Sequence, residues 1–152
     1  MSSAGIQLRN FCFPQDYAGV IELWEHAGPG VHLGRSDSLE EIEKKLQRDP
    51  DLFILAELDG HLVGAVLGGF DGRRGFMYHL AVDPSVRRQG IGQALTSELE
   101  KRLQARGCIK CYLLLVPGND TARVFYEDHG WEPMDVSIFG KELPGAVGSL
   151  PD

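Results

Sequence analysis

The sequence predicts a mixed α/β fold with one central sheet, mostly antiparallel but parallel at one junction, and helices on both faces. Three observations support this. Two apolar runs, 52–58 and 61–69, are joined by an Asp-Gly dipeptide, which favours a two-residue hairpin turn. Residues 91–106 then carry apolar side chains along one helical face. A nearly continuous apolar run at 111–116 follows, as in a strand of a parallel pair that is covered on both faces.

Local signals define the N-terminal elements. Alternating apolar residues predict a strand at 6–11. Apolar positions at helical spacing predict a helix from Asp16 to about His26. Ser38, with a glutamate three residues later, has the pattern of a capping box. A second helix is therefore expected from there to about Arg48, where a proline soon ends it.

The remaining elements complete the sheet. A polar turn at 71–74 leads into a third antiparallel strand at about 75–82. Residues 119–129 predict a short helix that begins at an Asn or Asp and is followed by a glycine. Residues 131–142 predict one or two final strands.

The composition is that of a single globular domain spanning residues 1–152, with 1–5 and 143–152 as loose ends. The net charge of -7 argues against broad nucleic-acid binding, which uses a basic face. No apolar run approaches the roughly 20 residues needed to span a bilayer, so no membrane partner is expected. Without a signal-peptide pattern or a disulfide framework, the expected location is cytoplasmic.

The strongest chemical signal lies in the loop before the helix at 91–106. Arg87 and Arg88 precede two glycines, Gly90 and Gly92, that open the helix. The first N–H groups of a helix lack internal partners and carry partial positive charge, so they stabilise an anion such as a phosphate or pyrophosphate. A helix start with solvated arginines is the alternative. The loop lacks the Lys-Ser/Thr of a P-loop and the third glycine or alanine of a dinucleotide fingerprint.

The segment from Leu80 to Pro84, followed by Arg87-Arg88-Gln89-Gly90-Ile91-Gly92, resembles motif A of the GCN5-related N-acetyltransferases, the GNAT family. The signature of that motif is Q/R-x-x-G-x-G/A. The resemblance extends over about residues 6–142 and is closest to small bacterial YpeA-like acetyltransferases. It implies a GNAT-like fold with one splayed parallel strand pair. It also implies transfer of an acetyl group from acetyl-CoA to a primary amine by direct attack in a ternary complex, with CoA as product.

The resemblance assigns roles to particular residues. The backbone of the strand before motif A would pair with the pantetheine arm, and the loop amides would hold the pyrophosphate. Asn119 would contact the arm, and Tyr126 would protonate the departing thiolate; for Tyr126, a core aromatic is the alternative. The cofactor site implied in this way comprises Leu80, Ala81, Val82, Arg87, Arg88, Gln89, Gly90, Ile91, Gly92, Gln93, Asn119 and Tyr126.

The general base is not identified by the resemblance, because Leu114 stands where some relatives have a glutamate. His79, on the motif-A strand, is a catalytic candidate, since an imidazole with its ordinary pKa near 6.5 suits proton transfer. A strand histidine with a structural partner is the alternative. Glu22, Glu25 and His32 are expected on the acceptor side, and a water chain to solvent is a further alternative for removing the proton. The acceptor itself, a small molecule or a protein, stays open.

A noncatalytic acyl-CoA sensor or interaction domain is the competing interpretation. It would need the Arg87–Gly92 loop but neither Tyr126 nor a base. No metal is expected, because the C-x-x-C at Cys108 and Cys111 offers only two of the four ligands of a structural zinc. The acyl chain length and the oligomeric state, a homodimer included, are also left open.

Overall fold

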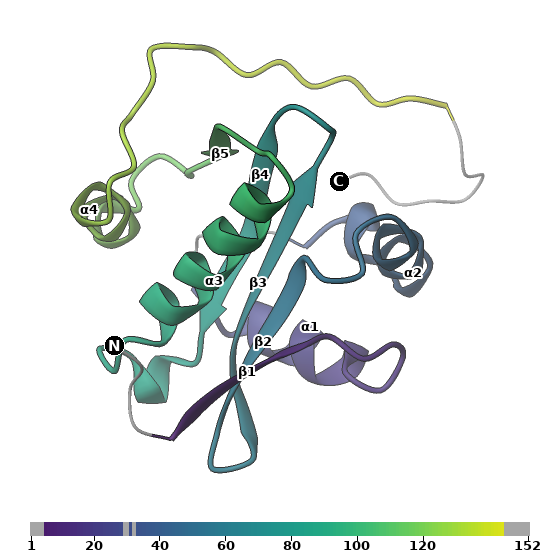
Figure 1. Ribbon diagram of the computed structural model, residues 1–152, viewed down its shortest axis with the longest axis vertical. Coiled ribbons are helices and arrows are strands. Elements are labelled where there is room, and N and C mark those ends of the chain that lie inside the picture. Colours follow the sequence, from purple (N-terminus) through teal and green to yellow (C-terminus); the bar gives the residue numbers. More distant parts are fainter. Residues whose placement is uncertain (1–4, 29–30, 32, 145–152) are drawn as a thin grey trace.

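The computed structural model describes residues 5–28, 31 and 33–144 (Figure 1). In these residues, five strands form one sheet in the order β1-β2-β3-β4-β5. The first four strands pair antiparallel, and β4 pairs with β5 in parallel. The predicted fold class is therefore confirmed. The strands are β1 (Ile6–Asn10), β2 (Phe53–Leu58), β3 (His61–Phe70), β4 (Gly75–Val82) and β5 (Cys111–Leu113).

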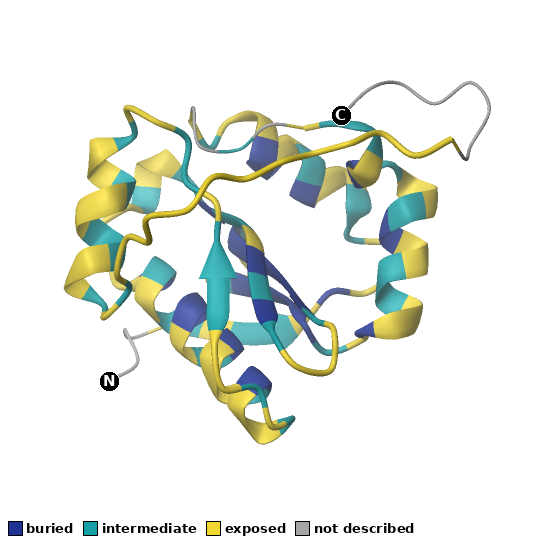
Figure 2. Cartoon of the chain, turned by 90° about the horizontal axis from the view of Figure 1, so that it is seen from above, coloured by how far each residue is buried: buried dark blue, intermediate teal, exposed yellow. Residues whose placement is uncertain are grey.

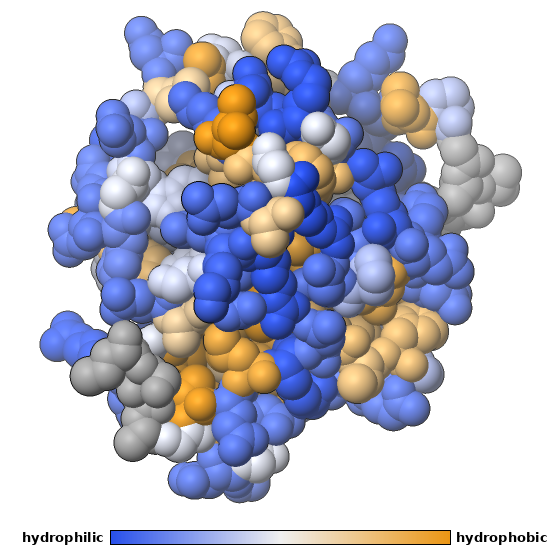
Figure 3. Space-filling view, viewed as in Figure 1, coloured by the Kyte–Doolittle hydropathy of each residue, from blue (hydrophilic) through white to orange (hydrophobic). Residues whose placement is uncertain are grey.

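Helices cover both faces of the sheet, with α1 and α2 on one side and α3 on the other (Figure 1). No helix in the described ranges is long and apolar enough to cross a membrane. Hydrophilic side chains cover most of the face that carries α3, and apolar ones form separate patches between them (Figure 3). The helices are α1 (Tyr17–Glu25), the 3-10 turn η1 (Arg35–Asp37), α2 (Leu39–Arg48), the 3-10 turn η2 (Pro84–Val86), α3 (Ile91–Ala105) and α4 (Asp120–Asp128).

The local signals in the sequence act as predicted. Asp59 and Gly60 have φ angles of 51° and 80°, the left-handed conformation that a tight hairpin turn requires. The Ser38 hydroxyl accepts a hydrogen bond from the Glu41 backbone N–H at 3.2 Å and so caps α2. Gly107, with φ of 90°, follows the end of α3.

Two buried clusters hold the sheet to its helices (Figure 2). One lies against α1 and α2 and contains Trp24 and Phe53. The other lies against α3 and contains Leu95 and Leu99. A Cβ atom at Gly64 on β3 would come within 2.9 Å of side-chain atoms of Ile91 and Leu95. The missing side chain at this position therefore lets the first turns of α3 seat closely on the sheet.

Two predictions about the C-terminal part are wrong. The strand expected at 111–116 ends at Leu113, and the side chain of Leu114 is 63% exposed. Residues 131–142 form no strand, and those from 132 onward lie exposed along an extended path (Figure 2). A strand needs a ladder partner for its backbone groups. Because β5 pairs over only three residues, it provides little regular edge for the alternating apolar residues of this segment. Of the loose ends expected at 1–5 and 143–152, residues 1–4 and 145–152 lie outside the described residues.

Candidate active site

The loop between β4 and α3 leads into the N-terminus of a 15-residue helix. Ala94 donates its backbone N–H to the Gly90 carbonyl at 3.0 Å. The amides of Ile91, Gly92 and Gln93 precede that donor, so they have no carbonyl one turn back to bind. The first turn of α3 carries no acidic side chain. The positive end of the helix dipole is therefore unopposed within the helix, and this position suits an anion.

The backbone of the same loop is held in an unusual conformation. Arg88 and Gly90 have φ angles of 69° and 81°, in the left-handed region. Glycine adopts this region freely, whereas for arginine it is sterically costly. When residues in the left-handed conformation alternate with residues in other conformations, their successive N–H groups point to one concave side. Such a concave side binds anions. The strained arginine therefore lies where the sequence predicts the pyrophosphate site.

Arg87 and Gly92 have more specific structural surroundings than the motif alone suggests. The Arg87 guanidinium donates to the Ala27 carbonyl at 2.6 Å and to the Val82 carbonyl at 3.4 Å. It thus ties the segment after α1 to the end of β4. A Cβ atom at Gly92 would lie 3.4 Å from Cζ of Phe125 on α4. The missing side chain at Gly92 therefore faces α4, while Gly90 supplies the left-handed turn.

The two parallel strands diverge beside this loop. Their pairing covers only Gly75 to Met77 on β4, opposite Cys111 to Leu113 on β5. The rest of β4, through Val82, is paired with β3 but has no β5 partner within the described sheet. From Leu80 to Val82 the edge of β4 that would face β5 has no strand partner among the described residues, and the backbone groups of alternate residues point to it. This edge leads directly to the N-terminus of α3.

Tyr126 and Asn119 belong to α4, on the other side of the divergence. Tyr126 is mostly buried, and burial raises its pKa to about 12. Its ring packs against Trp131, with centroids 6.0 Å apart, and against Phe125 at 5.3 Å. Asn119 caps the helix, since its side-chain oxygen accepts the Ala122 N–H at 3.3 Å. Asn119 therefore stabilises the N-terminus of the helix that carries Tyr126.

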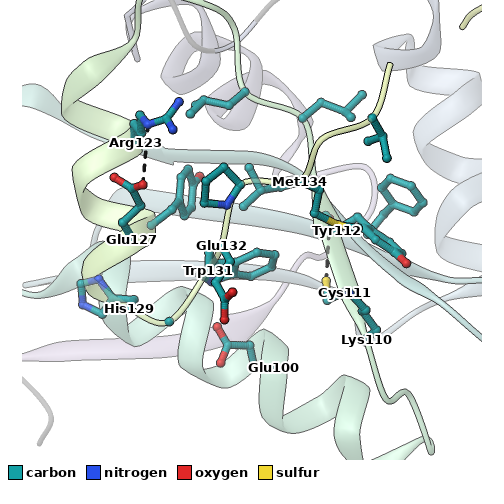
Figure 4. Close-up of a pocket in the computed structure, with 18 of the residues that line it drawn as sticks. Glu100, Lys110, Cys111, Tyr112, Arg123, Glu127, His129, Trp131, Glu132 and Met134 are labelled. Carbon is teal, nitrogen blue, oxygen red and sulfur yellow. Dashed lines mark hydrogen bonds and ion pairs between the residues drawn. The ribbon is translucent and has the colours of Figure 1, made fainter. Parts of the chain in front are cut away.

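A cavity of about 810 Å³ opens at the outer side of β5 (Figure 4). Arg123 and Glu127 of α4 stand on one side of it, Tyr112 of β5 stands on the other, and Trp131 and Met134 lie between them (Figure 4). Tyr126 contributes to the wall of this cavity. The Tyr126 ring is therefore approached from an open space as well as being packed in the core.

His79 lies on the face of the sheet that packs against α1 and α2, opposite to the face that α3 covers. A register shift in the β3–β4 pairing next to Leu67 leaves Tyr78 as an extra residue, so Tyr78 and His79 both line the cavity on this face. The Nε2 atom of His79 lies 3.0 Å from Oδ1 of Asp37, which follows α1 in sequence and is buried. The imidazole and the Trp24 ring also meet in a T-shaped contact, with centroids 4.7 Å apart.

A second cavity, of about 820 Å³, lies between α2 and the strands β3 and β4. His79 and Asp37 are at one part of its wall, and Ile42, Leu67 and Tyr78 form apolar parts of it. A ligand in this cavity would contact His79. Glu22 and Glu25, expected on the acceptor side, are exposed on α1 and do not line it. His32, the third residue expected there, lies outside the described residues.

Residues 15–131 match the acetyltransferase (GNAT) family. The chain belongs to this family. An acetyltransferase from Pectobacterium atrosepticum is 44% identical over 84% of this chain and 89% of its own length. Among solved structures, the PaiA N-acetyltransferase from Thermoplasma acidophilum in complex with coenzyme A has a TM-score of 0.74, with 20% identity over 96% and 95% of the two chains. The structure of AAC(6')-Iy in complex with a CoA-S-monomethyl-acetylneamine bisubstrate analogue has a TM-score of 0.71, with 20% identity over 91% and 98%.

In this GNAT chain, the sequence predicted the Arg87–Gly92 loop and the divergence of the two parallel strands. It also indicated His79 and Tyr126 as candidate catalytic residues. It did not indicate Asp37, whose carboxylate meets His79 across 42 positions of sequence. Asp37 directly precedes the capping serine of α2 and so looks like an ordinary turn residue. No local pattern shows that the turn folds back onto the motif-A strand.

Proposed function

We propose that the protein transfers the acetyl group of acetyl-CoA to a primary amine by direct attack in a ternary complex. The observation that carries this proposal is the free edge of β4 running into the N-terminus of α3. An unpaired strand edge offers N–H and C=O groups to an amide-containing chain. The helix N-terminus offers amides to a phosphate group. A ligand that fits both must join an anion to a chain of amides, as CoA does.

The residues present fit this ligand. Leu80, Ala81 and Val82 would pair with the pantetheine arm through their backbone groups. The amides of Arg88 to Gln93 would hold the pyrophosphate, and the exposed Arg88 guanidinium adds positive charge nearby. The likeness to proteins solved with CoA or a CoA conjugate supports CoA as the ligand.

The proposed reaction needs two proton movements. An amine is mostly protonated at neutral pH and must lose a proton before its lone pair can attack the thioester carbonyl carbon. His79 accepts that proton. The C–N bond forms and the C–S bond breaks, and the electrons of the C–S bond leave with the CoA sulfur. The nitrogen then loses its second proton, and the thiolate gains one. The products are an amide, the CoA thiol and one proton released to solvent.

Tyr126 is placed to assist the leaving sulfur. Its pKa of about 12 keeps the hydroxyl protonated at neutral pH. An ordinary thiol has a pKa of about 8.5, so complete proton transfer from Tyr126 to the thiolate is uphill by roughly 5 kcal/mol. We therefore assign Tyr126 the role of a hydrogen-bond donor that stabilises the developing thiolate, with the proton delivered as the nitrogen loses its own.

The acceptor side is open enough for amines of several kinds. The cavity between α2 and β4 measures about 820 Å³ and contains both apolar and charged side chains. The aminoglycoside-derived conjugate bound to AAC(6')-Iy supports an amine acceptor in general terms. The volume of this cavity would also admit an aliphatic amine or the amine of a peptide.

The proposal is tested by measuring thiol release from acetyl-CoA with neamine, butylamine and a short peptide bearing a free N-terminus. At least one amine should raise the release above the amine-free rate, and the His79→Gln variant should lose that increase. Calorimetry with CoA is run in parallel on the same samples. Tight CoA binding with no amine-dependent release in any reaction would favour the noncatalytic sensor instead.

A further inference from the structure

The contacts of Asp37 fix both of its carboxylate oxygens. The side chain is only 7% exposed. Its Oδ1 atom is 3.0 Å from His79 Nε2, and its Oδ2 atom accepts the backbone N–H of Gly34 at 3.0 Å. The Tyr17 hydroxyl donates to the Asp37 backbone carbonyl at 2.8 Å and holds the same turn from α1.

These contacts determine the protonation pattern of the imidazole. An ionised carboxylate only accepts hydrogen bonds. The His79 nitrogen that faces it must therefore carry the hydrogen, and a neutral His79 ring is the Nε2–H tautomer. Its Nδ1 atom then has the free lone pair. A base for the acceptor amine needs such a lone pair.

We propose that Asp37 is a positioning residue for acetyl transfer: it holds His79 in the Nε2–H tautomer, so that Nδ1 takes the proton from the acceptor amine. This inference rests on the proposed function. Both carboxylate oxygens of Asp37 are engaged, by His79 and by the Gly34 N–H, so Asp37 acts on the amine through His79. The edge contact with Trp24, which is 1% exposed, limits the ring from a second side.

The same pair stabilises the proton once it has been taken up. The imidazolium formed at His79 then lies 3.0 Å from a buried carboxylate. A charge-assisted hydrogen bond between these two groups is stronger than a neutral one. The arrangement corresponds to the carboxylate–imidazole part of hydrolase triads, where the carboxylate orients the ring and stabilises its charge.

The Asp37→Asn substitution has a predictable orientation. The Gly34 N–H needs an acceptor, so the oxygen of the introduced amide would stay on it and the NH2 group would face His79. His79 Nε2 would then have to accept a hydrogen bond, and the hydrogen would move to Nδ1. The variant therefore keeps the volume and the contacts but blocks the lone pair that the amine needs.

The direct test is the tautomer of His79, read from ¹⁵N chemical shifts of the imidazole in the CoA-free protein at a pH where the ring is neutral. Wild type should show Nε2–H, and Asp37→Asn should show Nδ1–H. Tyr17→Phe is the matched control, because it loosens the same turn without touching the carboxylate; it should keep Nε2–H. A neutral Nδ1–H ring in wild type overturns the proposal even if the variant does not fold.

Turnover with acetyl-CoA and the best amine of the panel provides the second readout. Asp37→Asn should lower kcat by about 10² or more, the range of a lost general base, with little change in the KM for acetyl-CoA. In a His79→Ala background the same substitution should change kcat by less than about twofold, because the two residues act as one unit. Additive losses would show a structural role and contradict the proposal. If no amine is acetylated, the proposed function fails, while the tautomer measurement still decides whether Asp37 sets the ring.

Discussion

Replacing Gly90 with alanine should weaken CoA binding without unfolding the protein. Gly90 precedes α3 with φ of 81° and ψ of 12°, a conformation that an alanine adopts only at a cost. The loop from Arg87 to Gly90 is exposed, so in the free protein it can relax away from this conformation. The amides of the first turn would then no longer be arranged for an anion, and CoA would have to restore them on binding.

The size of the effect follows from the backbone penalty. A left-handed conformation costs a non-glycine residue about 1 to 2 kcal/mol. If binding must restore it, the Kd for CoA should rise about fivefold to thirtyfold, since 1.4 kcal/mol corresponds to a factor of ten. The free energy of unfolding should fall by no more than the same amount.

Calorimetry with CoA and thermal unfolding of the same samples separate binding from stability. Gly92→Ala is the matched control: its new Cβ would meet Phe125 at an ordinary contact distance of 3.4 Å and point to α4. That variant should bind CoA within about twofold of wild type, because nothing is placed in the anion site. It should also stay folded, since alanine is a better helix former than glycine by roughly 1 kcal/mol. An unchanged CoA affinity in folded Gly90→Ala would refute the reasoning about the loop.

Three further predictions concern chemistry, packing and pH. Tyr126→Phe should lower kcat about tenfold to a hundredfold and leave CoA affinity intact, measured by single-turnover kinetics; a rate within about twofold would remove the hydroxyl from the mechanism. Gly64→Val should destabilise the protein by about 1 to 3 kcal/mol in urea unfolding, because its Cβ would approach Ile91 and Leu95 within 2.9 Å; unchanged stability would show that α3 can move freely. Hydrogen bonding from Arg9 lowers the pKa of Asp16, so its stabilisation is present above the unfolded value of about 4 and is lost as pH falls through the lower folded pKa. Asp16→Asn should therefore reduce stability at pH 7, and its difference from wild type should shrink as the pH falls further below the unfolded value, whereas a difference that does not change with pH would contradict the pairing.

Elements with strong local signals could be predicted from the sequence. The hairpin turn at Asp59-Gly60, the cap at Ser38 and the apolar face of α3 each depend on interactions within a few residues. The left-handed glycine before α3 belongs to the same class. Such features are visible in sequence because the physical cause and the structure occupy the same short segment.

The features that the sequence did not predict depend on distant partners. The alternation at 134, 136 and 138 is typical of a strand, but β5 ends at Leu113 and offers it no regular edge. The contact between Asp37 and His79 depends on how the turn after α1 folds over β4. Whether a Cβ atom at Gly92 would point to α4 depends on where α4 packs. Tertiary packing decides all three.

The placement of acetyl-CoA between β4 and β5 is tested most directly by a crystal structure of the protein with CoA. The pantetheine arm should pair with the backbone of Leu80 to Val82, and the pyrophosphate should accept hydrogen bonds from the amides between Arg88 and Gln93. The thiol should lie at the divergence of the two strands, between His79 and Tyr126. CoA bound in the cavity between α2 and β3, or at the outer side of β5 away from the α3 N-terminus, would contradict this placement.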